Sequence, residues 1–225
     1  MEKTDRRKRL RVPGCCLVFV VLVAILATGI VFFVAGGKMR VKSELDDIRA
    51  RGEPVRYADL EPPDVPDSDN AFLYYERAGG MLAQMPVPLL DATVRVSKTP
   101  MGQWSKGDVA LLRAYVKQDA AALAITHQGT LCKGFKSRVN WNSDVSAFFP
   151  LFAKLRELTR QLSYKAQIDL CDGRIDEATD TCGDMFRLSD HASSGATLIT
   201  YLVSTACRGI TYGLLEQIVV TASDE

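Results

Sequence analysis

Residue types suited to nucleophilic catalysis occur together at one place in the chain. They are Asp190, His191, Ser193 and Ser194. In a Ser-His-Asp triad the histidine takes the serine proton and the aspartate orients the histidine, so the three side chains must converge in space. Direct neighbours in a sequence rarely converge in this way, and no strand–turn–helix elbow surrounds the two serines. The sequence therefore predicts no catalytic residue here, and it places His191 near the C-terminal end of a helix.

Paired carboxylates occur at Asp46-Asp47 and at Asp176-Glu177. Two carboxylates can divide the roles of general acid and general base. Adjacent acidic residues in a helix-forming segment more often form a solvated helix face, which is the interpretation favoured here. The chain has no Gly-rich phosphate loop and no zinc-ligand spacing. We therefore predict no cofactor and no metal, and an enzyme is the less favoured class.

An uncharged apolar run of 23 residues occupies positions 15–37. As a helix it is about 35 Å long, which is enough to cross a bilayer. A cleaved signal peptide is the alternative, but its apolar region usually has about 7–15 residues. We expect a single transmembrane helix at 15–37 that stays attached to the rest of the chain.

Charge predicts the orientation of this anchor. Residues 1–14 form a basic tail with six of the 28 basic and two of the 27 acidic residues, so the remainder holds 22 against 25, a net charge of −3. Basic residues accumulate on the cytoplasmic side. We expect a cytoplasmic tail, one pass through the inner (cytoplasmic) membrane and an exported, periplasmic domain. The near-neutral exported part argues against nucleic acid as a partner.

The fold class predicted for the exported part is all-α. Residues 38–67 read as a juxtamembrane stalk and Pro-rich linker: a helix over 38–51 that Gly52 and Pro54 end, then four prolines that keep 53–67 extended. Residues 68–225 are expected to form one helical domain. Because the chain stops soon after a strongly apolar helix, a missing C-terminal half is also an expectation.

Within this domain, hydrophobic spacing predicts several helices. One starts at Ser68 or Asp69, residues 85–104 read as an irregular loop, and a capping box at Ser105 and Asp108 opens a helix that reaches Gly129. Three longer helices over 151–171, 174–190 and 193–221 are expected to run up, down and up. The buried stripe expected on the last of them comprises Ile199, Leu202, Ala206, Ile210, Leu214 and Ile218.

Two further site predictions concern Trp141 and the cysteines. Trp141 lies between two asparagines in a turn-rich segment, so it either pins a loop to the core or contacts a partner. Four cysteines follow the anchor: Cys132, Cys171, Cys182 and Cys207. Export permits disulfides, and unpaired buried thiols are an equal alternative. If a pair forms, the helix heights favour Cys171–Cys207 over Cys171–Cys182, whose levels differ by about 13 Å.

The turn and following helix, Gly173-Arg-Ile-Asp-Glu-Ala178, resemble part of a tetratricopeptide repeat (TPR). In that repeat a glycine opens the turn, and small residues at positions such as Ala166 and Ala178 let two helices touch. The usual tyrosine and closing proline are replaced near Asp169 and at Asp190. Only one repeat is found, so the resemblance implies degenerate, TPR-like antiparallel hairpins.

The layout also resembles a group of uncharacterised bacterial proteins with a single membrane anchor. The shared cues after the anchor are Arg51-Gly52-Glu53-Pro54, Asp59-Leu60, Pro62-Pro63 and Asp69-Asn70-Ala71. The group has no known activity, so the resemblance transfers no site residue.

The function expected from these observations is a non-catalytic, membrane-anchored interaction or scaffold module that holds another envelope protein. Two alternatives stay open. One is an envelope hydrolase or small-molecule-binding protein with an unrecognised site. The other is a pilin-like secretion-assembly subunit, although Phe19 occupies the position where such proteins carry glutamate.

Overall fold

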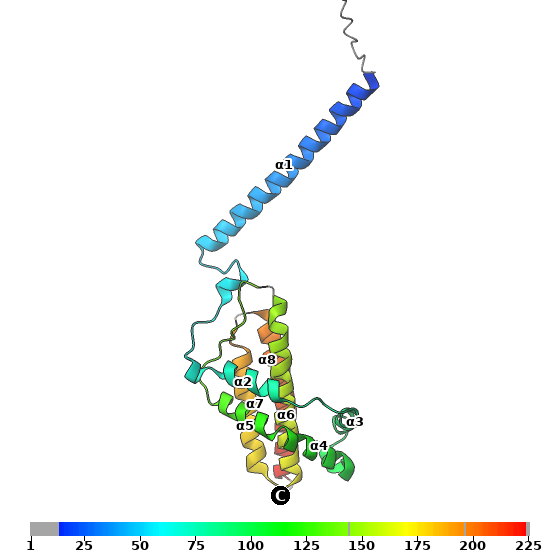
Figure 1. Ribbon diagram of the computed structural model, residues 1–225, viewed down its shortest axis with the longest axis vertical. Coiled ribbons are helices and arrows are strands. Elements are labelled where there is room, and N and C mark those ends of the chain that lie inside the picture. The colour runs from blue at the N-terminus through cyan, green and yellow to red at the C-terminus, as the bar shows by residue number, and fades with distance from the viewer. Residues whose placement is uncertain (1–13, 144, 196, 224–225) are drawn as a thin grey trace, which may run out of the picture. The chain divides into compact units, whose positions relative to one another are not determined.

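The computed structural model describes residues 14–143, 145–195 and 197–223, with side chains from Leu22 onward. The predicted basic tail, apart from Gly14, lies outside the described residues. Within them the chain forms eight α-helices and four short 3₁₀ turns, with one isolated β-bridge (Figure 1). The all-α prediction is confirmed. The chain divides into two units, one ending at Val55 and the other starting at Arg56.

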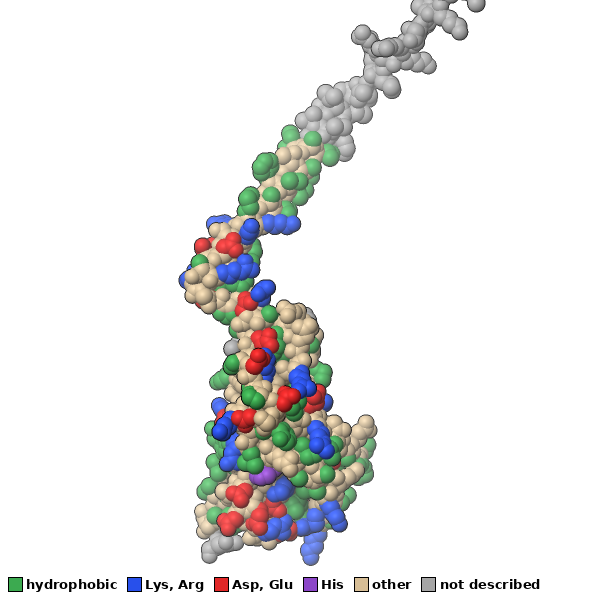
Figure 2. Space-filling view, turned by 60° about the vertical axis from the view of Figure 1, so that its left-hand side comes forward, with side chains coloured by type: hydrophobic (Ala, Val, Ile, Leu, Met, Phe, Trp, Pro, Cys, Tyr) green, Lys and Arg blue, Asp and Glu red, His purple; other side chains and the backbone are tan. Residues whose placement is uncertain are grey.

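Helix α1, Gly14–Ala50, joins the apolar run and the predicted stalk into one helix of 37 residues. Gly52 ends it because its φ of 74° leaves the helical region. Figure 2 shows apolar side chains giving way to charged ones toward its C-terminal end. By length and composition, Leu22–Ala50 could span a membrane, and so could α8, Leu198–Ser223, whose most apolar 18-residue window is 33% buried.

The Pro-rich segment folds as a strap, which we define as residues 56–69. It contains two 3₁₀ turns, Tyr57–Leu60 and Asp67–Asp69, and no α-helix. Lys136 fastens the strap through ion pairs with Glu61 at 2.9 Å and Asp64 at 2.6 Å. Just after the strap, Asn70 bridges to Gly134. The predicted extended, surface-lying segment is therefore tied to the loop that precedes α6.

Three long helices form the centre of the domain: α6 (Phe149–Cys171), α7 (Ile175–Ala192) and α8. The turn at Gly173 has a φ of 73°, so α7 runs back along α6. The apolar stripes of α6 and α7, which include Leu155, Leu158 and Met185, are buried and form the main core.

The stripe predicted on α8 was wrong in part. Leu202 is 55% exposed, while Val203, Cys207 and Thr211 are buried instead. Hydrophobic spacing alone does not predict this buried face, because it includes hydroxyl side chains. A threonine can be buried when its hydroxyl donates to a carbonyl of its own helix. Thr211 Oγ1 donates to the Cys207 carbonyl at 3.0 Å.

Four shorter helices pack around this centre: α2 (Ala71–Met81), α3 (Val87–Val96), α4 (Lys106–Gln118) and α5 (Ala120–Thr130). The cap of α2 is Asn70 rather than Ser68 or Asp69, because the Asn70 side chain accepts from the Phe72 amide. Ser105 caps α4 as predicted, accepting from the Asp108 amide.

Two expectations for this region were wrong. Residues 85–104 are not a loop throughout, since α3 begins at Val87 with Pro88 in its first turn, where a missing amide costs nothing. The helix predicted from Ser105 to Gly129 breaks at Asp119. The Asp119 Oδ1 atom accepts from the Ala83 amide at 3.0 Å, and this contact separates α4 from α5.

A buried hydrogen-bond chain joins α2, the loop after α5 and α7. The Tyr75 hydroxyl lies 2.8 Å from His191 Nδ1, and His191 Nε2 donates to the Cys132 carbonyl at 3.0 Å. A carbonyl can only accept, so Nε2 carries a proton, and in the neutral imidazole Nδ1 then accepts from the Tyr75 hydroxyl. Burial lowers the pKa of His191, opposed by the Cys132 carbonyl and the charges of Asp190 and Asp69.

The close approach of α5 to α2 predicts a steric effect at Gly129. A Cβ atom there would lie 2.7 Å from the Tyr75 ring and 2.9 Å from Tyr74 Cβ. We expect Gly129→Ala to destabilise the domain by about 1–3 kcal/mol, although alanine is the better helix former. Gly80→Ala is the matched control, because its Cβ meets nothing within 4 Å. Urea unfolding of the full chain in detergent measures both, and equal effects would contradict the steric argument.

The lowered pKa of His191 predicts a pH dependence of stability. As the pH falls below about 6.5, the unfolded chain takes up the proton before the folded one, so the free energy of unfolding decreases. The decrease ends once the pH passes below the folded-state value. In His191→Gln this contribution is absent, so its stability should fall less between pH 7.5 and pH 5 than that of the wild type. Parallel pH profiles of the two chains would refute the assignment.

Candidate functional site

A groove lies between α4 and α5 on one side and α7 on the other, with α6 as its floor. It encloses about 560 Å³. The sixteen lining residues are Arg113, Val116, Lys117, Ala120, Leu123, Ala124, His127, Leu162, Lys165, Ile168, Asp169, Arg174, Glu177, Asp180, Thr181 and Asp184. We call this surface the groove. Its volume is within the range of ligand-binding clefts.

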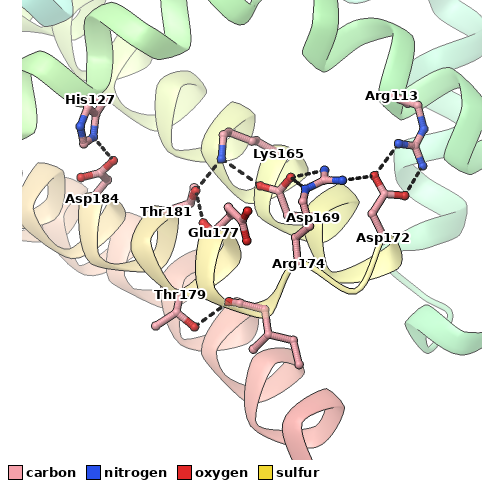
Figure 3. A network of polar contacts seen from close by, with 11 residues as sticks. Arg113, His127, Lys165, Asp169, Asp172, Arg174, Glu177, Thr179, Thr181 and Asp184 are labelled. Atoms are coloured by element: carbon pink, nitrogen blue, oxygen red, sulfur yellow. Dashed lines mark hydrogen bonds and ion pairs between the residues drawn. The ribbon is translucent and has the colours of Figure 1, made fainter. Parts of the chain in front are cut away.

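A continuous polar network runs along one end of the groove (Figure 3). The Arg113 guanidinium donates to both carboxylate oxygens of Asp172, at 2.6 and 2.7 Å. Arg174 joins Asp172 to Asp169, and Lys165 donates to Asp169 and to Thr181, each at 2.9 Å. The network therefore ties α4 to the turn between α6 and α7, which fixes the width of the groove at that end.

The network shifts the pKa of Asp172, the carboxylate that lies at the turn between α6 and α7. Hydrogen bonds from Arg113, opposed by burial and aided by Arg174, lower the pKa of Asp172 to about 2. The Asp172 side chain is 21% exposed and that of Arg113 is 48% exposed, so solvent screens the pair in part. Its bidentate geometry still makes it the most specific contact between α4 and the turn.

At the other end of the groove, His127 of α5 meets Asp184 of α7. His127 Nδ1 lies 2.7 Å from Asp184 Oδ2. The Asp184 carboxylate is 8% exposed and also accepts from Thr130 at 2.7 Å and from Arg187 at 3.1 Å. A carboxylate in this position orients an imidazole, and an oriented imidazole can accept or donate a proton. Neither residue was singled out from the sequence as a site.

Three charged side chains lining the groove form no ion pair with another described residue. They are Lys117 on α4, and Glu177 and Asp180 on α7. The wall made by α4 and α5 is thus basic and the wall made by α7 is acidic. Between them the surface is apolar, with Leu162 and Ile168 on the floor and two exposed alanines on α5. This arrangement suits an amphipathic segment better than a small anion or cation.

The structure does not place Trp141 where a partner could reach it. Its side chain is 4% exposed and stacks on Tyr57 with a centroid separation of 5.1 Å. It also contacts Phe148 edge-on at 4.9 Å. Trp141 therefore pins the strap to the core, which is the first of the two alternatives that the sequence left open.

The structure also does not bring Cys171 and Cys207 together. All four described cysteines that follow the anchor are free thiols. Cys207 lies beside Thr159. Burial raises the pKa of the Cys207 thiol, and the hydrogen bond with the Thr159 hydroxyl opposes this effect. Thr159 is twelve residues before Cys171 on α6, about 18 Å along the axis. The start of α8 at Leu198, five residues later than predicted, accounts for about 7.5 Å of this difference in height.

No group of three or more His, Cys, Asp or Glu residues that could hold a metal ion occurs among the described residues. Comparison of the chain with protein-family models, with curated proteins and with solved structures finds no match. The two resemblances noted from the sequence therefore stay predictions. The functional argument depends on the geometry of this chain alone.

The Arg113–Asp172 pair predicts a measurable coupling between α4 and the turn. A double-mutant cycle with Arg113→Ala and Asp172→Asn should give about 0.5–1 kcal/mol of coupling at pH 7. Because the folded-state pKa of Asp172 is about 2, the coupling should persist at pH 4 and be lost only as the pH falls toward that value. The exposed Arg138–Asp67 pair is the control, with coupling near zero. Equal coupling in both cycles would contradict a special role for the turn.

Proposed function

We propose that this chain is a membrane-anchored interaction module of the cell envelope that holds a helical segment of another envelope protein in the groove. The observation that carries the proposal is the groove itself. Its apolar floor is bordered by a basic wall with unpaired Lys117 and an acidic wall with unpaired Glu177 and Asp180. A helix with an apolar ridge, acidic residues on one flank and basic residues on the other is complementary to it.

The small side chains on the α5 wall of the groove favour a helical ligand. Ala120 and Ala124 are exposed and one turn apart on α5, so a ligand helix can approach its backbone closely. The floor residues Leu162 and Ile168 are buried and apolar.

The α6–α7 hairpin supports the TPR-like part of the proposal. Ala166 and Ala178 are both fully buried, as the small residues of such a hairpin must be where two helices touch. Gly173 supplies the left-handed turn. Within the proposal the remaining helices are degenerate hairpins rather than a regular array.

Anchoring in the inner membrane, with the domain exported, is the second part of the proposal. It is supported by the fully exposed apolar part of α1 and by the basic residues before it. One pass is proposed because α8 is partly buried against α6 and α7.

A hydrolase or small-molecule-binding protein is the second candidate function. The oriented imidazole of His127 favours it. A hydrolase of this kind also needs a nucleophile, and the hydroxyl group that lines the groove is that of Thr181. This hydroxyl already accepts from Lys165 and donates to the Glu177 carbonyl. The geometry therefore supports binding better than catalysis.

Charge reversal in the groove tests the proposed function. A photo-crosslinking amino acid at Ala124 of the full-length chain should capture one envelope protein in cells. Glu177→Lys should reduce this capture by about fivefold or more, because it removes the negative charge that faces the ligand. Asp176→Lys is the matched control: it changes the same charge in the same helical turn but does not line the groove.

The outcomes separate the two candidate functions. Equal capture by both charge variants, or no captured protein, would refute the interaction module. If His127→Gln leaves capture intact while it abolishes a chemical activity of the chain, the second candidate function is supported instead.

A further inference from the structure

Helix α8 presents an apolar face that no other described element of the unit starting at Arg56 covers. The helix packs against α7 and α6 along one side. On the other side six large apolar side chains are each between 55% and 73% exposed. They are Leu198, Tyr201, Leu202, Tyr212, Val219 and Val220. Side chains at these spacings share one helix face, and they extend over about 33 Å of it in two groups, one toward each end of the helix. An exposed apolar face of this length is typical of an interaction surface.

The middle of this face carries glycines instead of large side chains. Gly209 and Gly213 are one turn apart, and a Cβ atom built on either meets nothing within 4 Å. The larger apolar side chains lie toward the two ends of the helix. A second helix can therefore approach the backbone most closely near residues 209–213, with large side chains packing on either side of the crossing.

The two charges of α8 indicate which helix fits. They are Arg208 and Glu216, which are eight residues or about 12 Å apart. Glu216 lies on the apolar face and forms no ion pair with a described residue, while Arg208 at the edge of the face pairs with Asp190 at 2.6 Å. If two α8 helices cross in antiparallel orientation around Tyr212, Glu216 of each copy comes opposite Arg208 of the other. The face is thus complementary in charge to itself.

A lipid surface is a poorer occupant of the same face. Helices that lie in a membrane interface carry lysine and arginine beside their apolar face. Here the charge at the centre of the face is an acidic one, which the hydrocarbon boundary disfavours.

We propose that α8 is a homodimer interface, in which two copies of this chain pair through antiparallel α8 helices around a twofold axis near Tyr212. The inference is independent of the groove, because no residue of the apolar face lines it. Each copy contributes the same surface. In the dimer, Glu216 of one copy contacts Arg208 of the other copy instead of solvent.

The first test uses the full chain in detergent at several concentrations. A photo-crosslinking amino acid at Tyr212 should give an adduct of two copies. The same amino acid at Phe149, which is 51% exposed on α6, should not. Adducts of equal yield from both positions, or a Tyr212 adduct with lipid or another protein in cells instead of a second copy, would overturn the proposal.

The second test exploits the charge pattern. Arg208→Glu alone and Glu216→Arg alone each place like charges opposite one another in a pair of identical copies, so each should lower the dimer adduct by about fivefold. Mixing the two variants places opposite charges at both contacts, and the adduct should return. A mixture that pairs no better than either variant alone would overturn the antiparallel arrangement.

A third variant guards against misfolding of the charge variants. Gly209→Leu adds a side chain whose first atom meets nothing in its own chain, so the fold should be kept. The same side chain fills the space that the second α8 needs. We expect unchanged helix content by circular dichroism and loss of the dimer adduct. A folded Gly209→Leu chain that still forms the adduct would overturn the proposal.

Discussion

The burial of α6 on almost all sides is the constraint on which the domain depends. This helix contacts α2, α4, α5, α7 and α8, so each of the other packed elements is placed by it. A helix so enclosed satisfies part of its polar side chains within its own turns. Thr159 donates to the Leu155 carbonyl, and Gln161 donates to Glu157. These internal bonds let a sequence of only moderate hydropathy occupy the centre of the fold.

The groove lies where the surrounding helices leave α6 uncovered. Lys165 and Asp169 are on the part of α6 that faces neither α2 nor α8, and there α4 and α7 stand apart. Charged residues collect at this opening because water reaches them, and they pair across it instead of being buried singly. The same opening leaves Leu162 and Ile168 at the base, so an apolar floor with charged edges results from the packing of α6 itself.

Features with a local cause were predictable from the sequence, and features with a distant cause were not. The stripes on α6 and α7 and the turn at Gly173 follow from spacing and from the need for a positive φ. The break at Asp119 depends on the amide of Ala83, which is 36 residues away. The expectation of a loop over 85–104 missed α3 because Pro88 is compatible with a helix when it lies in the first turn.

The candidate site was hidden for the same reason. Its two defining contacts join residues 59 and 57 positions apart, Arg113 to Asp172 and His127 to Asp184. Their charges look like ordinary solvated helix faces until the helices are packed. The sequence left Trp141 between two alternatives for the same reason, because its stacking partner Tyr57 lies in the strap, far away along the chain.

The ion pair between Arg113 and Asp172 has a consequence for how the groove responds to dissolved salt. The pair is partly exposed, so ions in solution weaken it. Rising ionic strength then loosens the hold of α4 on the turn while it also screens any ligand that the groove attracts by charge. For the proposed ligand, affinity would fall with salt more steeply than the ion pairs between ligand and groove alone imply, because the width of the groove changes together with its electrostatic field.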